Sequence, residues 1–186
     1  MDARVVRTQS ALQEALLQLA RDRPLDEISV ADITDQAGVN RSTFYQHYSD
    51  KETLLADALD AAAGEAAEFL PDVVTWSEDP PRSLAIFLSH VDANPLVYRR
   101  VLGSHGSAIV TARLRDRIDA LALSGLANAD EHGWEGMPDE VVSAGLAGAA
   151  LGVIEAWLRC DPRPPVDTAA LWMWRMITGP QSVAGK

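Results

Sequence analysis

The chain has 186 residues, of which 47% are hydrophobic, and it carries a formal net charge of −11. The hydrophobic content excludes a disordered chain, and the single cysteine, Cys160, excludes an intrachain disulfide. Because the overall charge is acidic, any contact with nucleic acid must depend on basic residues gathered at one place.

The first element expected is an amphipathic helix from about Arg4 to Arg21. Its apolar stripe, spaced by three and four residues, consists of Leu12, Leu16 and Leu19. Basic residues stand at the start of this helix and acidic residues follow its end: Arg4 and Arg7, then Asp22, Asp26 and Glu27. The two signs of charge are therefore separated along the helix.

Two short helices joined by a tight turn are expected between residues 29 and 48. Ser29 is a suitable N-cap for the first, and Gly38 stands where a left-handed backbone is needed between the two. Asn40 can cap the second helix, whose inward residues would be Phe44 and Tyr48. The outward face is then polar and consists of Arg41, Ser42, Thr43, Tyr45, Gln46 and His47. A short polar-faced helix held at a fixed angle fits the major groove of DNA.

A third helix is expected to begin at Ser49, which forms a capping-box pattern with Glu52 just before an apolar run. Lys51 lies in the first turn of that helix, where a cation opposes the helix dipole. A DNA phosphate would make a lysine favourable there, because backbone N–H groups at a helix start already attract phosphate. The alternative is a solvated surface lysine. Beside the polar helix, we prefer the phosphate contact.

The middle of the chain is also predicted to be helical, with breaks at Pro71, Thr75–Pro81, Asn94–Pro95 and Gly103–Gly106. The helix after the last break runs to about Ala129, with apolar residues Ile109, Leu114, Ile118 and Leu121. A basic run on this helix is interpreted as a solvated or ion-paired face rather than a second DNA site: Arg113, Arg115 and Arg117. No segment shows the alternation of apolar and polar residues that is typical of β-strands, so the predicted fold class is all-α.

Two closing helices are expected, from Met137 to Leu158 and from Asp167 to Thr178. The first carries three glycines at three- and four-residue spacing: Gly145, Gly148 and Gly152. Each costs roughly 1 kcal/mol relative to alanine in a helix, so a bare face indicates close approach of another helix. The second carries apolar residues that need a partner: Leu171, Trp172 and Trp174. A symmetric four-helix interface between two copies explains both features. The alternative is packing within one subunit.

The longest nearly uncharged stretch, from Val141 to Ile154, is too short to span a bilayer, and no secretory signal opens the sequence. We therefore expect a cytoplasmic protein without membrane contact. Glycine-rich phosphate loops, His-Glu-x-x-His, cysteine pairs and nucleophile elbows are missing from the sequence. On this basis the chain is predicted not to be an enzyme, and no metal site and no cofactor are predicted.

The segment from Ile33 to Leu55 resembles the DNA-binding domain of the TetR family of bacterial transcriptional repressors. The shared pattern is a turn glycine, a small or hydroxyl residue, an apolar–tyrosine pair, a further aromatic residue and a Lys-Glu-x-Leu-Leu helix start. In this chain the pattern is formed by Gly38, Ser42–Thr43, Phe44–Tyr45, Tyr48 and Lys51–Leu55. Tyr48 stands where phenylalanine is more usual, so its hydroxyl needs a partner. Ala31, at the start of the second helix of the chain, cannot make the contact to a base or phosphate that an arginine at this position makes in some members.

The resemblance implies about nine helices in two domains. Residues 1–50 would form a helix-turn-helix DNA-binding domain, and residues 51–186 an effector-binding and dimerisation domain. It further implies a homodimeric repressor that binds a palindromic DNA operator and releases it when a small-molecule effector binds. The effector pocket would lie in the middle helices, with candidate residues Phe69, Trp76, Phe87, His90, Tyr98 and His105. The alternative function is an all-helical homodimeric module for small-molecule or protein binding without DNA binding, which fits the acidic charge.

Overall fold

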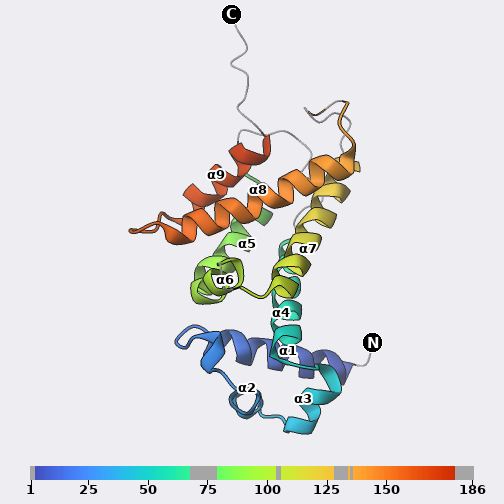
Figure 1. Ribbon diagram of the computed structural model, residues 1–186, viewed down its shortest axis with the longest axis vertical. Helices are drawn as coiled ribbons and strands as arrows, with labels where there is room; N and C mark the ends of the chain where they lie inside the picture. Colours follow the sequence, from blue (N-terminus) through green and yellow to red (C-terminus); the bar gives the residue numbers. More distant parts are fainter. Residues whose placement is uncertain (1–2, 68–78, 104–105, 128–133, 135, 179–186) are drawn as a thin grey trace, which may run out of the picture. The chain divides into compact units, whose positions relative to one another are not determined.

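A computed structural model describes residues 3–67, 79–103, 106–127, 134 and 136–178 of the chain (Figure 1). Within these residues the chain consists of nine α-helices and one short 3₁₀ helix, with no strand, which confirms the all-α prediction. The elements are α1 (Ala3–Leu19), η1 (Leu25–Glu27), α2 (Val30–Ala37), α3 (Arg41–His47), α4 (Lys51–Ala67), α5 (Arg82–Ala93), α6 (Pro95–Leu102), α7 (Ala108–Ala127), α8 (Asp139–Arg159) and α9 (Val166–Thr178).

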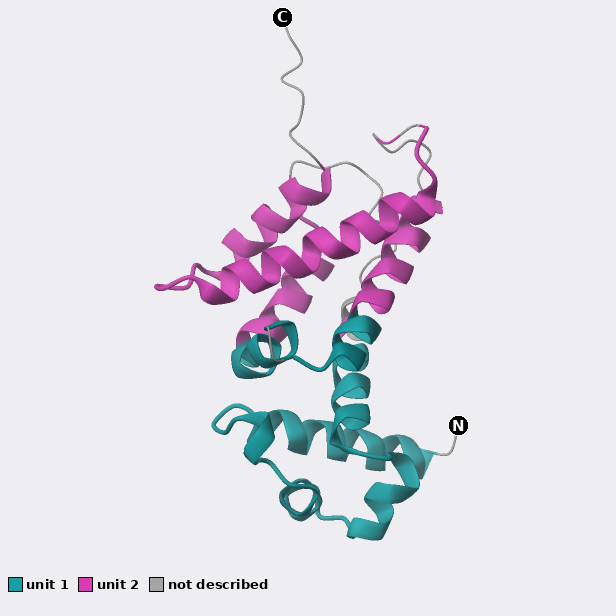
Figure 2. Ribbon diagram, viewed as in Figure 1, with its two compact units in different colours: residues 1–62, 93–114 teal, residues 63–92, 115–186 magenta. Residues whose placement is uncertain are grey.

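The chain forms two compact units, each assembled from two stretches of sequence (Figure 2). Unit 1 contains residues 1–62 and 93–114, and unit 2 contains residues 63–92 and 115–186. α4 and α7 each contribute residues to both units. The predicted boundary after residue 50 concerns a division of function, and it stays a prediction.

The N-terminal helices of unit 1 share an apolar core. Leu12 and Leu16 of α1 are fully buried, as the predicted stripe requires, and Leu19 is half-buried. Ile33 of α2 and Phe44 of α3 are fully buried as well. Because each large apolar side chain contributes roughly 1.5–3 kcal/mol when buried, this core holds α2 and α3 at a fixed angle.

The start of α7 is attached to α4 by an ion-pair fork. Arg113 donates to the carboxylates of Asp57 and Asp60 at 2.8 and 2.7 Å. The hydrogen bond to Asp57 and the charge of Asp60 raise the Arg113 pKa. The ion-paired interpretation of the basic run is confirmed for this residue. Residues 93–114 therefore belong structurally with the N-terminal helices, although residues 63–92 separate the two stretches in the sequence.

Two local predictions are wrong by one residue. The N-cap of α4 is Asp50 and not Ser49, because the Asp50 carboxylate accepts from the Thr53 backbone N–H at 2.7 Å. The side chain of Glu52 instead accepts a hydrogen bond from Ser107 at 2.8 Å. On α7, Ile109 is 65% exposed whereas Val110 is buried. The apolar stripe of α7 therefore begins one position later than predicted.

Unit 2 is centred on Trp157 of α8, which is fully buried and donates from Nε1 to the Pro164 carbonyl at 2.8 Å. The Arg163 guanidinium lies 5.6 Å from the Trp157 ring centroid and pairs with Asp92 at 2.7 Å. α8 has 21 residues and is long and apolar enough to cross a membrane by length and composition. This corrects the prediction that the apolar stretch from Val141 to Ile154 is too short to span a bilayer. Since 44% of its apolar window is buried in the chain, the same observation fits a core helix.

Candidate nucleic-acid interface

Local side chains build the turn between α2 and α3. Ser29 Oγ accepts from the Asp32 backbone N–H at 3.1 Å, and the Asp32 carboxylate accepts from the Ser29 backbone N–H at 2.8 Å. This capping box begins α2, and the hydrogen bonds from Ser29 lower the Asp32 pKa. α2 ends at Gly38, whose φ of 66° is left-handed, as predicted.

α3 has one buried edge and one polar crest. The predicted inward residues are confirmed, since Phe44 is fully buried and Tyr48 is 2% exposed at the C-cap. With 3.6 residues per turn, the side opposite these two aromatics belongs to Ser42 and Gln46, both exposed. The remaining outward residues lie on two flanks: Arg41 and Tyr45 on one, Thr43 and His47 on the other.

The first flank carries a preformed pair. Arg41 Nη2 lies 3.4 Å from Tyr45 Oη, and the guanidinium carbon lies 5.7 Å from the tyrosine ring centroid. Tyr45 is 49% exposed and meets Phe44 edge to face at 5.3 Å. The buried phenylalanine therefore supports an exposed tyrosine and arginine on the surface of α3. Asn40 occupies the N-cap position of α3, but its side chain makes no capping hydrogen bond.

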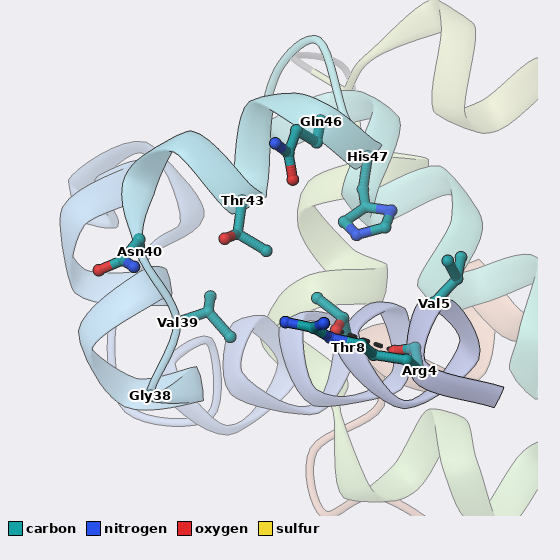
Figure 3. A pocket seen from close by; sticks show the side chains of 9 residues that line it. All are labelled: Arg4, Val5, Thr8, Gly38, Val39, Asn40, Thr43, Gln46 and His47. Atoms are coloured by element: carbon teal, nitrogen blue, oxygen red, sulfur yellow. Dashed lines mark hydrogen bonds between the residues drawn. The ribbon is translucent and has the colours of Figure 1, made fainter. Parts of the chain in front are cut away.

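The second flank borders a groove of about 510 Å³ between α1 and α3 (Figure 3). Its lining comes from α1, the turn and α3: Arg4, Val5 and Thr8; Gly38, Val39 and Asn40; Thr43, Gln46 and His47. Within the described part of the chain, this lining contains a guanidinium, an imidazole, two hydroxyls and two amides, and no carboxylate. Such a set suits a negatively charged group.

The sequence pattern indicated Arg4 as part of the basic start of the first helix, but it did not indicate Thr8 as a site residue. The groove forms because α1 packs against α2, which in turn packs against α3, and the contact of α1 with α2 is a tertiary one. The available signal was the four-residue spacing of Arg4 and Thr8, which puts both on one face of a helix.

Lys51 is engaged inside the chain. Its Nζ donates to the backbone carbonyls of Leu25 and Ile28, the second at 2.7 Å. Arg23 adds a donor to the same corner, at 2.6 Å from the Glu27 carbonyl. The ammonium group of Lys51 thus fastens the corner around η1 to the start of α4. Its predicted phosphate contact stays a prediction, and two of its three donors already have partners.

The predicted need for a partner at the Tyr48 hydroxyl is met. Gln13 of α1 donates from Nε2 to Tyr48 Oη at 3.3 Å. Burial raises the pKa of Tyr48 to about 12. The hydroxyl therefore links α1 to the end of α3 in its neutral form.

The candidate effector residues are only partly described. Phe87 in unit 2 is buried and His90 half-buried, and Tyr98 in unit 1 is fully buried. The other three candidates, Phe69, Trp76 and His105, lie outside the described residues. The pocket stays a prediction.

The candidate dimer residues differ in their surroundings. A Cβ at Gly145 or Gly152 would have no described atom within 4 Å, whereas one at Gly148 would lie 3.5 Å from Arg115 of the same chain. On α9, Trp172 is 38% exposed and Leu171 is half-buried. Trp174 is only 6% exposed, because it packs inside its own chain, and it offers little surface to a partner. The exposed face of α8 and α9 is thus narrower than predicted.

An exposed, polar second helix after a left-handed glycine turn is the arrangement of helix-turn-helix proteins. Residues 12–58 match the family described as "Bacterial regulatory proteins, tetR family". The chain is 36% identical over 103 residues to the HTH-type transcriptional regulator YxbF of Bacillus subtilis, covering 53% of this chain and 27% of the relative. It is 27% identical over 94 residues to the dhaKLM operon transcriptional activator DhaS of Lactococcus lactis, covering 50% and 48%. These matches span from about a quarter to about half the length of the curated relatives.

Among solved structures, the fold is similar to that of a TetR transcriptional regulator from Streptococcus agalactiae. The TM-score is 0.63 at 21% identity, with 96% of this chain and 97% of that chain covered. The helix-turn-helix segment, residues 12–58, matches the TetR family, as its sequence pattern indicated.

Proposed function

We propose that the protein is a transcriptional regulator that binds a DNA operator sequence-specifically through α3. The main support for this proposal is the polar crest of Ser42 and Gln46, which faces outward because Phe44 and Tyr48 on the opposite side of α3 are buried. Amide and hydroxyl side chains on a helix can read base edges in the major groove. The acidic total charge is compatible with this function, because none of the described residues that line the groove beside α3 is a carboxylate.

Homodimerisation through α8 and α9, and hence a palindromic operator, is the second part of the proposal. Gly145 and Gly152 leave the α8 backbone open, and Trp172 and Met176 expose apolar surface on α9. Burial of this surface against a second copy would stabilise a dimer. Two-fold symmetry would then place two α3 helices on half-sites one or more helical turns apart.

Release of DNA by a small-molecule effector completes the proposed mechanism. α4 runs from Lys51 in unit 1 to residues of unit 2, so an effector bound among the helices of unit 2 could change the position of α4. A coupling of typically 1–3 kcal/mol would suffice to weaken operator binding. We propose repression in the cytoplasm as the outcome, while the relative DhaS is named an activator.

The test is selection of a duplex by the wild-type protein from a random-sequence library, followed by titration of that duplex. Gln46→Ala should weaken binding by about 1–3 kcal/mol and relax the preference at one position of each half-site. Ser89→Ala, at an exposed polar residue of α5 in unit 2, is the control and should bind normally. Failure of the wild-type protein to select any sequence would favour the alternative, a helical module without DNA binding.

A further inference from the structure

The groove between α1 and α3 has a definite place relative to the crest of α3. Ser42 and Gln46 form the crest, and the two flanks slope away from it on opposite sides. A helix that lies in the major groove has a sugar–phosphate strand on each side. Each flank of α3 therefore faces a different strand when the crest faces the bases.

The two flanks of α3 carry different side chains. The flank of Arg41 and Tyr45 carries its own cation and hydroxyl. The opposite flank, Thr43 and His47, has no arginine or lysine of its own, and α1 supplies one, because Arg4 lines the same groove (Figure 3). The cation needed on that side thus comes from a separate helix.

From this geometry we propose that the groove is a phosphate site, in which Arg4 of α1 and His47 of α3 hold the DNA backbone of the strand opposite to the one met by Arg41. Thr8 lines the groove beside them, and its hydroxyl donates to the Arg4 carbonyl at 3.0 Å. The inference rests on the proposed function and adds the first two turns of α1 to the interface. Its support is the groove lining, which combines a guanidinium, an imidazole and hydroxyl groups and, among the residues that the structure describes, includes no carboxylate. Charge-assisted hydrogen bonds to a phosphate are what such groups form.

The placement of α1 is secured by contacts outside the groove. Gln13 donates to Tyr48 at 3.3 Å, and Gln36 of α2 donates to Gln18 at 3.0 Å. α1 is thereby fixed to the helix-turn-helix motif at two points. Arg4 is consequently presented by a helix with a defined position relative to α3, although its own side chain is long and exposed.

The experiment measures the salt dependence of binding to the duplex selected by the wild-type protein. Loss of one phosphate contact lowers the slope of log K against log salt by about 0.9. Arg4→Gln should therefore lower the slope by about one for each bound subunit and weaken binding about equally for matched and mismatched duplexes. Arg21→Gln removes the same charge from the chain just beyond the other end of α1, outside the groove, and should leave the slope unchanged.

A second arm locates the contact on the DNA. A neutral methylphosphonate placed at successive backbone positions should weaken wild-type binding at one position beside each half-site. Arg4→Gln should be insensitive to the replacement at that position only. Equal slopes for Arg4→Gln, Arg21→Gln and wild type, or a sensitivity pattern unchanged by Arg4→Gln, would overturn the inference alone. A wild-type protein that selects no duplex would overturn the proposed function and the inference together.

Discussion

Single side chains in unit 1 have partners that fix the geometry of the reading helix. Lys51 donates hydrogen bonds to the carbonyls of Leu25 and Ile28, and the Tyr48 hydroxyl accepts one from Gln13. Both links join elements that are far apart in sequence. At this scale, the interface depends on residues that need not touch DNA themselves.

Replacing Lys51 by methionine should destabilise the protein, because two carbonyls lose a charged donor. We expect a loss of about 1–3 kcal/mol in the free energy of unfolding, measured by urea denaturation. The salt slope of DNA binding should stay close to that of the wild type. An unchanged stability together with a slope lower by about one per subunit would instead assign Lys51 to a phosphate contact.

Tyr48 should make stability fall at alkaline pH. Its pKa is about 12 in the folded chain against 10.0 for a free tyrosine, so the neutral form is favoured by folding. The resulting stability is fully present below pH 10 and is lost as pH rises towards 12. Wild type should therefore lose stability more steeply than Tyr48→Phe across this window in pH-dependent denaturation. If the stability of the two proteins fell in parallel with rising pH, the raised pKa of a buried Tyr48 hydroxyl would be contradicted.

At the scale of elements, the turn and the caps determine how α2 leads into α3. The capping box at Ser29, the left-handed Gly38 and the inward Phe44 and Tyr48 were all predictable from the sequence. Each depends on residues within five positions of one another, where spacing alone defines geometry.

Features that depend on distant contacts were not predictable in this way. The partner of Glu52 is Ser107, and Arg113 joins Asp57 and Asp60 across more than fifty positions. The groove required the packing of α1 against α2, which carries α3. On α7 the first buried apolar residue is Val110 and not Ile109, because tertiary contacts decide which residue is covered. Periodicity predicted these helices, but it could not assign their neighbours.

Gly38→Ala tests the turn. A Cβ has open space at this position within the described chain, so the only penalty is the left-handed backbone, roughly 1–2 kcal/mol. Thermal denaturation should show this loss. Gly125→Ala, at a helical glycine of α7 with equally open surroundings, should instead be neutral or stabilising by up to about 1 kcal/mol. Equal effects at the two positions would contradict a strained turn.

At the scale of the whole molecule, the proposed regulator requires two copies of α3. The open backbone at Gly145 and Gly152 and the exposed Trp172 offer a surface for a second copy. Because a Cβ at either glycine would meet no described atom within 4 Å, a substitution there can affect dimerisation without affecting folding.

Gly145→Ala should therefore act on association and not on the subunit. Nothing in the described chain opposes the added methyl group, so unfolding should be unaffected or slightly delayed. The methyl group would hold a second helix away, and we expect the dimer dissociation constant to rise about tenfold or more in sedimentation equilibrium, a change of about 1.4 kcal/mol. Gly125→Ala serves as the control. A wild-type protein that sediments as a monomer would contradict the proposed interface.

Chemical-shift mapping of the protein with its selected duplex tests most directly whether α3 reads DNA. We expect the largest changes along Arg41–His47, with a second set in the first two turns of α1 around Arg4 and Thr8. A scrambled duplex should give weaker changes confined to the basic residues. Unchanged signals along α3, or the largest changes in unit 2, would contradict the assignment of α3 as the reading helix.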